Sequence, residues 1–333
     1  MPPPPPSRLA PADVTLDAAS LGVTVRALQC HTDTVVTMCV AGDGRLVTAS
    51  SDRAVRVWRV ASGVRDATLV GHTEVVASLC ALLDGSGRVV AGSYDGVARL
   101  YELDAARGGA EVSPLREYRG HTKVVATMAA LSGGRLATGS IDFTIRVWEV
   151  ETGVCVATLT DNLSWVYTLA VVGEHTLVSD GYEVLCVWDT RSYTAVAAVP
   201  VRSEVKRLLR LSDGGVASGH NDGVVRVWDV ARWEAVGEVC GGTQEVRGLA
   251  EVWDGRVVSV DCVGVVRLWD VATRTRVGVI KTARRSTCTC CVTLDGSVLL
   301  GTIGGRVLVV GFPWARRGAA VVGWAAMWAG VWA

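Results

Sequence analysis

Histidine, threonine, aspartate and tryptophan recur together in this chain at fixed spacing. A carboxylate that orients a histidine, which in turn activates a hydroxyl, is an arrangement used for nucleophilic catalysis. The same groups can instead form a buried hydrogen-bonded chain that ends on an indole N–H. Because the set repeats beside a tryptophan, and no G-x-S-x-G, H-E-x-x-H or P-loop pattern occurs, we predict a structural role and no enzyme activity. The two complete sets are His31, Thr48, Asp52 and Trp58, and His121, Thr138, Asp142 and Trp148.

An aromatic residue closes each of six repeats along the chain. It stands at positions 58, 101, 148, 188, 228 and 269, in steps of 43, 47, 40, 40 and 41 residues, and Val310 marks a degraded seventh copy a further 41 residues on. Self-similarity at such a period indicates a repeat architecture. The closing tripeptides are Arg56-Val57-Trp58, Arg99-Leu100-Tyr101, Arg146-Val147-Trp148, Cys186-Val187-Trp188, Arg226-Val227-Trp228 and Arg267-Leu268-Trp269.

Each repeat is predicted to contain four short strands, a to d. In the first repeat these are residues 35–40, 45–50, 55–59 and 67–69, separated by turns such as Asp43-Gly44 and Ser62-Gly63. Turn dipeptides between β-branched runs are typical of sequential hairpins. A helical interpretation fails because the apolar runs are short and glycine interrupts them about every ten residues.

These repeats resemble the WD-repeat family, whose signature is a Gly-His pair, an Asp-containing turn and a terminal Trp-Asp dipeptide. The resemblance covers residues 22–311 and implies an all-β, seven-bladed propeller of four-stranded blades that acts as a scaffold for protein partners. Residues 25–32 match 66–73 position for position, so a d strand precedes the first repeat, and 287–311 lacks one. Joining the two would close the ring. Residues 1–21 are then a Pro-rich leader and 312–333 a Trp/Ala-rich apolar tail.

Only some blades keep the family's hydrogen-bonded set of histidine, hydroxyl, aspartate and tryptophan. We therefore expect blades four to seven to be tied less rigidly, or held by packing alone. The departures are Tyr101 for Trp and Ala91 for the hydroxyl in blade two, Asp161-Asn162 for Gly-His and Tyr182 for Asp in blade four, a missing histidine beside Asp222 in blade five, Val263 for Asp in blade six, and Gly304 and Val310 for Asp and Trp in blade seven.

The family's partners usually bind on the face with the d–a and b–c loops, around the mouth of the central channel. One channel-facing position reads Val36, Ala77, Ala126, Tyr167, Lys206, Arg247 and Cys288 around the ring. Aromatic residues and arginine dominate interface hot spots, and arginine clusters suit acidic or phosphorylated peptides. Alternatively, the aromatics pack locally and the basic residues are merely solvated. The predicted partner-binding residues are Phe143, Trp165, Tyr167, Tyr182, Lys206, Arg247, Arg284 and Arg285, with Arg202 nearby.

A second predicted surface is the segment Trp188-Asp189-Thr190-Arg191. It resembles the W-D-x-R ending by which some family members dock on the cullin-4 ligase adaptor as substrate receptors. The alternative is that Arg191 simply follows the last strand residue of a blade, since so short a pattern recurs by chance.

Charge and cysteine content narrow the remaining classes. Lys plus Arg equals Asp plus Glu at 33 each, so the net charge does not favour nucleic acid as a partner. The arc from Arg202 to Arg285 keeps a nucleic-acid- or phospho-ligand-binding propeller as the alternative. The ten cysteines fall mostly in apolar runs, and no secretory leader is evident at Met1, which favours buried thiols in the cytoplasm or nucleus. Cys288, Cys290 and Cys291 do not share one strand face, so we expect no metal and no cofactor.

The two ends lie outside the repeats. Pro2 to Pro6 form a polyproline stub, which we expect to be a disordered leader rather than a ligand for a Pro-binding domain. The last 16 residues carry no charge and place Trp324, Trp328 and Trp332 at helical spacing. They are too short to span a bilayer. We expect the tail to dock on the propeller or be disordered, with weak membrane contact as the second interpretation.

Overall fold

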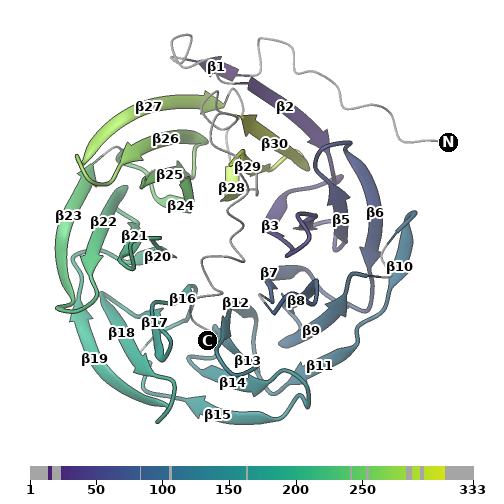
Figure 1. Cartoon of the computed structure of the whole chain (residues 1–333), viewed down its shortest axis with the longest axis horizontal. Helices are drawn as coiled ribbons and strands as arrows, with labels where there is room; N and C mark the ends of the chain where they lie inside the picture. The colour runs from purple at the N-terminus through teal and green to yellow at the C-terminus, as the bar shows by residue number, and fades with distance from the viewer. Residues whose placement is uncertain are drawn as a thin grey trace.

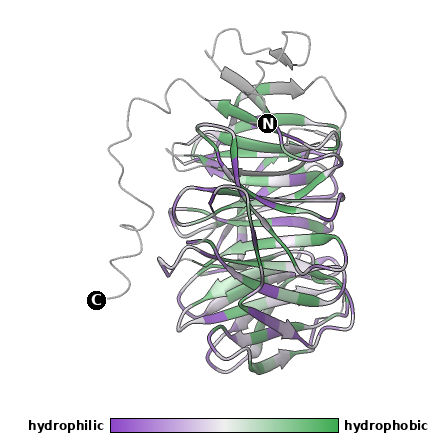
Figure 2. Ribbon diagram, turned by 90° about the vertical axis from the view of Figure 1, so that its right-hand side faces the viewer, coloured by the Kyte–Doolittle hydropathy of each residue, from purple (hydrophilic) through white to green (hydrophobic). Residues whose placement is uncertain are grey.

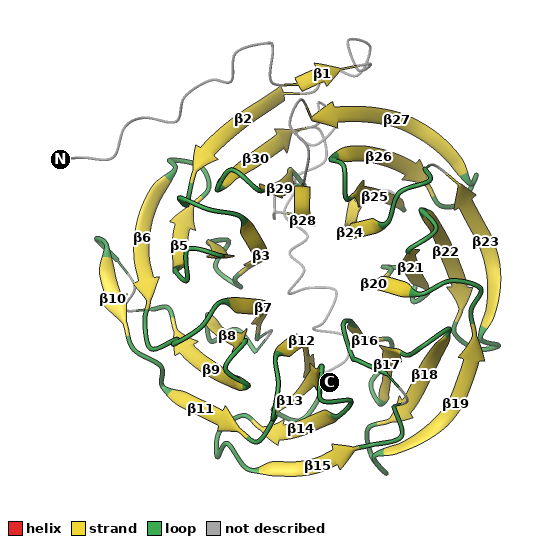
Figure 3. Cartoon of the chain, turned by 180° about the vertical axis from the view of Figure 1, so that it is seen from behind, coloured by secondary structure: helices red, strands yellow, loops and turns green. Residues whose placement is uncertain are grey.

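The computed structural model describes residues 14–16, 24–82, 84–104, 107–162, 164–240, 242–252, 255–282, 287–292 and 296–311. Seven antiparallel sheets stand around a ring like the blades of a propeller (Figure 1), and the described part of the chain contains strands and loops but no helix (Figure 3). The predicted fold class is therefore confirmed: the protein is all-β, with seven blades of four-stranded sheets.

Blades one to three follow each other along the chain, with the innermost strand of each blade given first. Blade one is β3 (Val35–Val40), β4 (Leu46–Ser50), β5 (Val55–Arg59) and β6 (Val64–Leu69); blade two is β7 (Val76–Ala81), β8 (Arg88–Ser93), β9 (Val97–Glu102) and β11 (Arg116–Arg119); blade three is β12 (Val125–Leu131), β13 (Arg135–Ser140), β14 (Ile145–Glu149) and β15 (Cys155–Leu159).

Blades four to six repeat the same order. Blade four is β16 (Leu169–Val171), β17 (Thr176–Asp180), β18 (Val184–Asp189) and β19 (Thr194–Pro200); blade five is β20 (Val205–Arg210), β21 (Val216–His220), β22 (Val224–Asp229) and β23 (Glu234–Cys240); blade six is β24 (Val246–Val252), β25 (Arg256–Asp261), β26 (Val265–Asp270) and β27 (Thr275–Thr282).

Blade seven is built from both ends of the described chain. It consists of β28 (Thr287–Val292), β29 (Val298–Thr302), β30 (Arg306–Gly311) and β2 (Thr24–Gln29). The outer strand β2 pairs antiparallel with β30, from Thr24 opposite Gly311 to Gln29 opposite Arg306. Because the first and last long strands share one sheet, the ring closes without leaving a blade half-built.

Two blades carry a fifth strand on their outer edge. The strand β1 (Val14–Leu16) pairs antiparallel with β27 of blade six, and β10 (Ala110–Val112) pairs parallel with β6 of blade one. The segment that contains β10 connects β9 to β11 and therefore belongs to blade two. It crosses to the neighbouring blade, which the repeat pattern did not predict.

The apolar core lies between the blades. Strand b of each blade is nearly all buried, and seven clusters of buried side chains each join residues of two neighbouring blades; Trp58, for example, packs with Leu28 and Leu299 of blade seven. Figure 2 shows the apolar residues concentrated on the strands. Strands that are covered on both faces read as continuous apolar runs, which explains the valine-rich sequence.

Glycines in strand b let neighbouring blades approach closely. A Cβ atom at Gly139 would lie 2.5 Å from Cγ1 of Val166 in blade four, and one at Gly219 would lie 2.5 Å from Cγ1 of Val246 in blade six. Both glycines sit in ordinary strand backbone, so the requirement is space and not a left-handed conformation.

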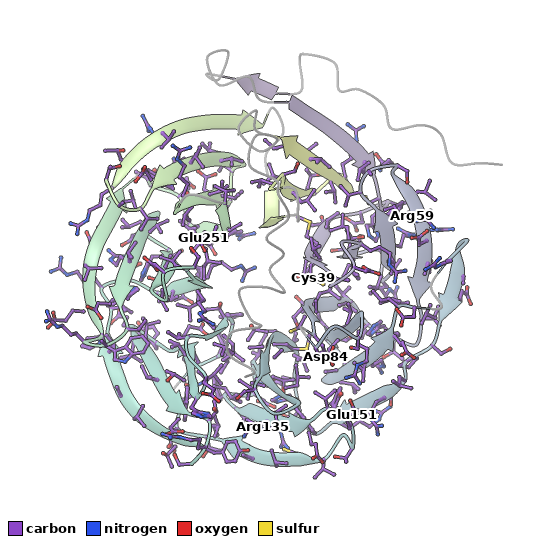
Figure 4. All side chains as sticks on the ribbon, viewed as in Figure 1. Cys39, Arg59, Asp84, Arg135, Glu151 and Glu251 are labelled. Atoms are coloured by element: carbon purple, nitrogen blue, oxygen red, sulfur yellow. The ribbon has the colours of Figure 1, made fainter. Side chains whose placement is uncertain are left out.

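Arginines at the start of strand b join consecutive blades. They lie on the face of the ring that carries the a–b turns. Arg45 donates to the carbonyl of Leu103 in blade two at 2.7 Å, and Arg88 forms an ion pair with Glu151 of blade three, also at 2.7 Å. Arg135 donates to the carbonyl of Thr190 in blade four at 3.0 Å. Figure 4 marks Arg135 and Glu151 among the side chains of the ring.

Candidate functional site

The histidine-containing set of blade one forms one continuous hydrogen-bonded chain. Nδ1 of His31 lies 3.0 Å from the Asp52 carboxylate, and Nε2 lies 2.8 Å from the Thr48 hydroxyl, which accepts the indole N–H of Trp58 at 2.9 Å. Blade three repeats this geometry. His121 lies 2.8 Å from the Asp142 carboxylate and 2.7 Å from the Thr138 hydroxyl, and this hydroxyl accepts the indole N–H of Trp148 at 2.8 Å. The structure thus brings each predicted set together across strands b and c and the d–a loop.

The electrostatics of these sets fit a structural role. Burial lowers the pKa of His31 to about 4 and also lowers that of His121, so both rings are neutral at pH 7. Burial opposes ionisation of Asp52, but the Ala54 N–H and His31 hold the pKa of that carboxyl below its ordinary value. Thr48 is 0% exposed, and its hydroxyl is bonded to both His31 and Trp58. This arrangement links the strands of the blade.

Blade two replaces two members of the set by one tyrosine. The Tyr101 hydroxyl lies 2.9 Å from Nε2 of His72 and donates to the carbonyl of Val70 at 2.8 Å. It therefore occupies the place of both the missing strand-b hydroxyl, where Ala91 stands, and the indole N–H.

Blades four to seven are predicted to be tied less rigidly or held by packing alone, and packing alone is wrong for blades four to six. Their indole N–H groups all donate to a strand-b serine: Trp188 to Ser179 at 2.9 Å, Trp228 to Ser218 at 2.7 Å and Trp269 to Ser259 at 2.8 Å. In blade four Asn162 takes the place of the histidine and accepts from Ser179 at 3.2 Å. Among the described contacts of blade seven, Val310 packs without such a bond, as predicted from the missing tryptophan.

Blades five and six recruit their polar groups from strand b itself. His220 stands two residues after Ser218, so the two side chains share one strand face; its Nε2 lies 2.7 Å from the Ser218 hydroxyl and its Nδ1 donates to the Ser203 carbonyl at 2.9 Å. In blade six Asp261 replaces the carboxylate missing at Val263 and accepts from Arg267 at 2.8 Å. Matching by position missed both substitutes, because Asp261 lies two residues before Val263 and His220 lies in strand b instead of the d–a loop that holds the histidine in blades one and three.

The d–a and b–c loops of each blade lie on one face of the ring. Backbone N–H groups of the b–c loops donate to carbonyls of the d–a loops, for example Tyr94 to Val75 at 2.9 Å and Asn221 to Glu204 at 3.0 Å. Residues on the two loop sets can therefore meet one ligand.

The position predicted from the sequence to face the channel forms a β-bulge. In six blades the register of strand a skips one residue, which is Val36, Ala77, Ala126, Lys206, Arg247 and Cys288 in turn. A bulged residue is left unpaired in the strand ladder and re-aims its side chain.

Blade four departs from this pattern at Tyr167. Its strand a begins only at Leu169, and the N–H groups of Tyr167 and Thr168 donate to the Asp180 carboxylate at 2.9 and 3.0 Å. Val166 donates instead to Ser140 of blade three at 3.1 Å. The segment before strand a thus leans towards the b–c loop of blade three.

Aromatic side chains gather on the loop face of blades two to four. The Trp165 and Tyr167 rings meet edge-on with centroids 5.9 Å apart, and Phe143, Trp165 and Tyr182 are exposed. Sequence reasoning missed Tyr94, which is 53% exposed in the b–c loop of blade two. Burial and then the charges of Glu204 and Asp180 raise the pKa of Tyr167. Hereafter the aromatic face means Tyr94, Phe143, Trp165, Tyr167 and Tyr182.

The predicted basic residues carry their own counter-charges. Nζ of Lys206 lies 5.7 Å from the centre of the Tyr167 ring but only 2.7 Å from the Glu204 carboxylate. Arg247 pairs with Glu245 at 3.3 Å. Arg284 and Arg285 lie outside the described residues, as do the leader and the tail apart from β1. Lys206 and Arg247 are therefore each paired with a carboxylate two residues away.

The W-D-x-R segment lies at the opposite end of β18 from the aromatic face. Asp189 accepts from the backbone N–H of Arg191 at 2.8 Å, and the guanidinium of Arg191 pairs with the same carboxylate at 2.8 Å. The Arg191 side chain is nevertheless 67% exposed and accessible to a partner.

The described residues show neither a metal site nor a membrane-spanning helix. There, no group of three or more His, Cys, Asp or Glu side chains is arranged to hold a metal ion, and no helix is long and apolar enough to cross a membrane.

Comparison with known proteins identifies the family. The model of the WD domain, G-beta repeat matches residues 22–59, 63–102 and 112–149. The chain is a WD-repeat β-propeller. Its fold superimposes on the WD40 β-propeller domain of Doa1 with a TM-score of 0.76 at 20% identity, covering 87% of this chain and 97% of that one. WD-repeat propellers generally serve as protein-interaction scaffolds.

The relatives of this WD-repeat propeller are diverse. Mitochondrial division protein 1 of Schizosaccharomyces pombe is 30% identical over 227 residues, which are 63% of this chain and 31% of the relative. Transducin beta-like protein 3 of Mus musculus is 30% identical over 242 residues, 66% of this chain and 29% of the relative. The chain thus spans less than a third of either relative, and their names indicate no shared partner.

Proposed function

We propose that this WD-repeat propeller is a scaffold that binds a segment of a partner protein on the aromatic face. The observation that carries the proposal is that loops of three consecutive blades present five aromatic side chains on one face of the ring, with Trp165 and Tyr167 in contact. Tyr182, the most open, is 68% exposed. Exposed aromatic groups that gather on a rigid frame are typical of interface hot spots, because they bury a large area at low cost in side-chain entropy.

The charges beside the aromatic face favour a mixed partner over an acidic or phosphorylated one. Lys206 and Arg247 are paired with Glu204 and Glu245, so a phosphate would have to displace a carboxylate already in place. The chain's zero net charge also argues against the nucleic-acid alternative. A peptide with apolar side chains for the rings and polar groups for the Lys206–Glu204 pair fits best.

The test compares partners recovered by affinity purification and mass spectrometry. The variant Trp165→Ala/Tyr167→Ala removes the centre of the aromatic face. Its matched control is Val154→Ala/Leu115→Ala, which removes two exposed apolar side chains elsewhere on the ring. The proposal expects a set of proteins that is lost from the first variant and kept by the control. Recovery of the same proteins by wild type and both variants would contradict it.

We also propose that Arg191 contributes to docking on a cullin-ligase adaptor. The support is its exposure on the face opposite the aromatic face, where an adaptor and a substrate could bind at once. Arg191→Ala should abolish capture of the adaptor, whereas Arg232→Ala should not, because Arg232 follows the Trp228-Asp229 dipeptide one residue later than the pattern requires. Equal capture by both variants would end this proposal.

We infer that the protein works in a reducing compartment, the cytoplasm or the nucleus. The supporting observation is that Cys30, Cys39, Cys80, Cys155, Cys186 and Cys262 are free thiols. Burial raises the pKa of the Cys30 and Cys80 thiols to about 12 and about 11, which suits unreactive core residues.

A further inference from the structure

The groove between the outer parts of blades one and two is filled by a segment of this chain. There β10 pairs parallel with β6, with Ala110 beside Ala67 and Val112 beside Leu69. The Gly109 N–H donates to the Asp66 carbonyl at 2.7 Å, and the Val70 N–H donates to the Val112 carbonyl at 2.9 Å. The added strand thus satisfies backbone groups on the outer edge of β6.

Two side chains of the added segment seal that groove. Val112 packs against the cluster that contains Leu69 and Tyr101. Pro114 lies against Gly71, where a Cβ atom would be 3.1 Å from its Cδ. A short apolar residue followed two positions later by proline therefore fits between the outer strand of one blade and the closing aromatic of the next.

The equivalent groove between blades four and five is open. Val199 corresponds to Leu69, because each pairs with the residue three places before the closing tryptophan of its blade. By the same alignment Val201 corresponds to Gly71, and Trp228 corresponds to Tyr101. Val199, Val201 and Trp228 line a groove of about 590 Å³, together with Trp233, Val236, Glu238 and Arg274.

The edge of β19 beside this groove can accept a strand. Residues 194–200 carry no charge, and Val196 is 60% exposed, so no charged side chain of this strand opposes pairing. The backbone groups of Asp66 and Val70 point from β6 towards β10. Backbone groups alternate in direction along a strand, so those of the counterparts in β19, Val196 and Pro200, point outwards. Because Pro200 stands in the place of Val70 and has no N–H, pairing would rest on the carbonyl of Val196 and on both backbone groups of Ala198.

We propose that the outer edge of β19 and the groove beside it bind an extended segment of a partner protein by strand addition, as β10 of this chain is bound by β6. The segment carries a short apolar residue and, two positions later, a proline. This surface lies on the circumference of the ring and is separate from the aromatic face, so it can be tested independently.

The probe is a fluorescein-labelled peptide with the sequence of residues 108–115, GGAEVSPL, titrated into the full chain and followed by anisotropy. The edge of β6 is already occupied by β10 of the same chain, at an effective concentration of about a millimolar. The added peptide cannot compete with it there and therefore reports on the open groove. We expect saturable binding that Ala198→Pro weakens by about tenfold or more, since it removes an outward N–H. Ala198→Thr, which installs the residue of β6 at this place, should bind like wild type.

A second measurement remains valid if Ala198→Pro fails to fold. On wild type, the peptide should slow hydrogen exchange of the Ala198 amide, and a peptide with Asp in place of the residue of Val112 should not. Unsaturable binding by wild type, equal binding by a folded Ala198→Pro variant, or unchanged exchange at Ala198 would overturn the proposal. Dimerisation of wild type that Ala198→Pro abolishes, seen by light scattering, would also overturn it by assigning the edge to a second copy.

Discussion

The hydroxyl of Tyr101 lies 2.9 Å from Nε2 of His72 and donates to the carbonyl of Val70 at 2.8 Å. One phenol thus replaces a threonine hydroxyl and an indole N–H in blade two. Tyr101→Phe should lower the free energy of unfolding by about 1–3 kcal/mol, because it leaves buried polar groups without a partner. Urea titration measures the loss. Tyr182→Phe removes an exposed hydroxyl and should change stability by less than about 0.5 kcal/mol; equal losses would contradict the bridging role.

The fold could be predicted from the sequence because the same pattern of residues recurs in each blade. Each blade encodes four strands, a turn and a closing aromatic, so the loss of one feature, as at Val310, leaves six other copies to set the period. The strand β10 could not be predicted in this way. It occurs once, in an insertion between β9 and β11, and its position depends on the groove beside β6 and not on its own pattern.

The site was only partly predictable. Phe143, Trp165 and Tyr182 follow from their loop positions. Lys206 and Arg247 pair with glutamates two residues away, so their positive charges alone do not indicate a site for an anionic partner. His220 and Asp261 were missed. A strand presents residues i and i+2 on the same face, so Asp261 can replace a carboxylate at position 263, and His220 can reach the Ser218 hydroxyl from strand b instead of from the d–a loop. Matching by position detects neither.

Acid should destabilise the protein through its buried histidines. Burial lowers the pKa of His31 and of His72 to about 4, against 6.5 in the unfolded chain. The unfolded state therefore binds more protons between these values, and stability should fall as the pH falls from about 6.5 to about 4. His31→Asn installs the residue that blade four uses at this place. It should be less stable at pH 7 but show a shallower decline, measured by urea titration at several pH values. If the stability of the variant and of wild type fell equally with pH, His31 would not contribute to the acid destabilisation.

Asp180 should act in the opposite direction. Burial raises the pKa of its carboxyl to about 7, although the N–H groups of Thr168 and Tyr167 and the charge of Arg207 on β20 oppose the shift. A raised pKa gives stability that is full below pH 3.8 and is lost as the pH rises to about 7. Asp180→Asn keeps an oxygen for both N–H groups and removes the charge. Its melting temperature relative to wild type should rise between pH 4 and 7 and then level off; a constant difference would show that the carboxyl titrates normally.

Space between blades three and four should limit strand b at Gly139. An added methyl group would lie 2.5 Å from Cγ1 of Val166 and 2.7 Å from Cγ2 of Thr127, so Gly139→Ala should cost about 1–3 kcal/mol of stability. Gly173→Ala is the matched control, since the nearest atom to its added Cβ is 3.8 Å away. It should change stability by less than about 0.5 kcal/mol.

A double-mutant cycle separates a steric cause from loss of strand propensity at Gly139. Val166→Ala alone should destabilise the protein by leaving a cavity in a fully buried site, but in the Gly139→Ala background it also removes Cγ1 of Val166, the atom nearest to the added methyl group, while Cγ2 of Thr127 remains. The double variant should therefore be more stable than the sum of the single losses predicts, by about 0.5–3 kcal/mol. Additive losses would mean that the blades can shift apart to admit the methyl group. The approach of blades three and four would then not be fixed by Gly139.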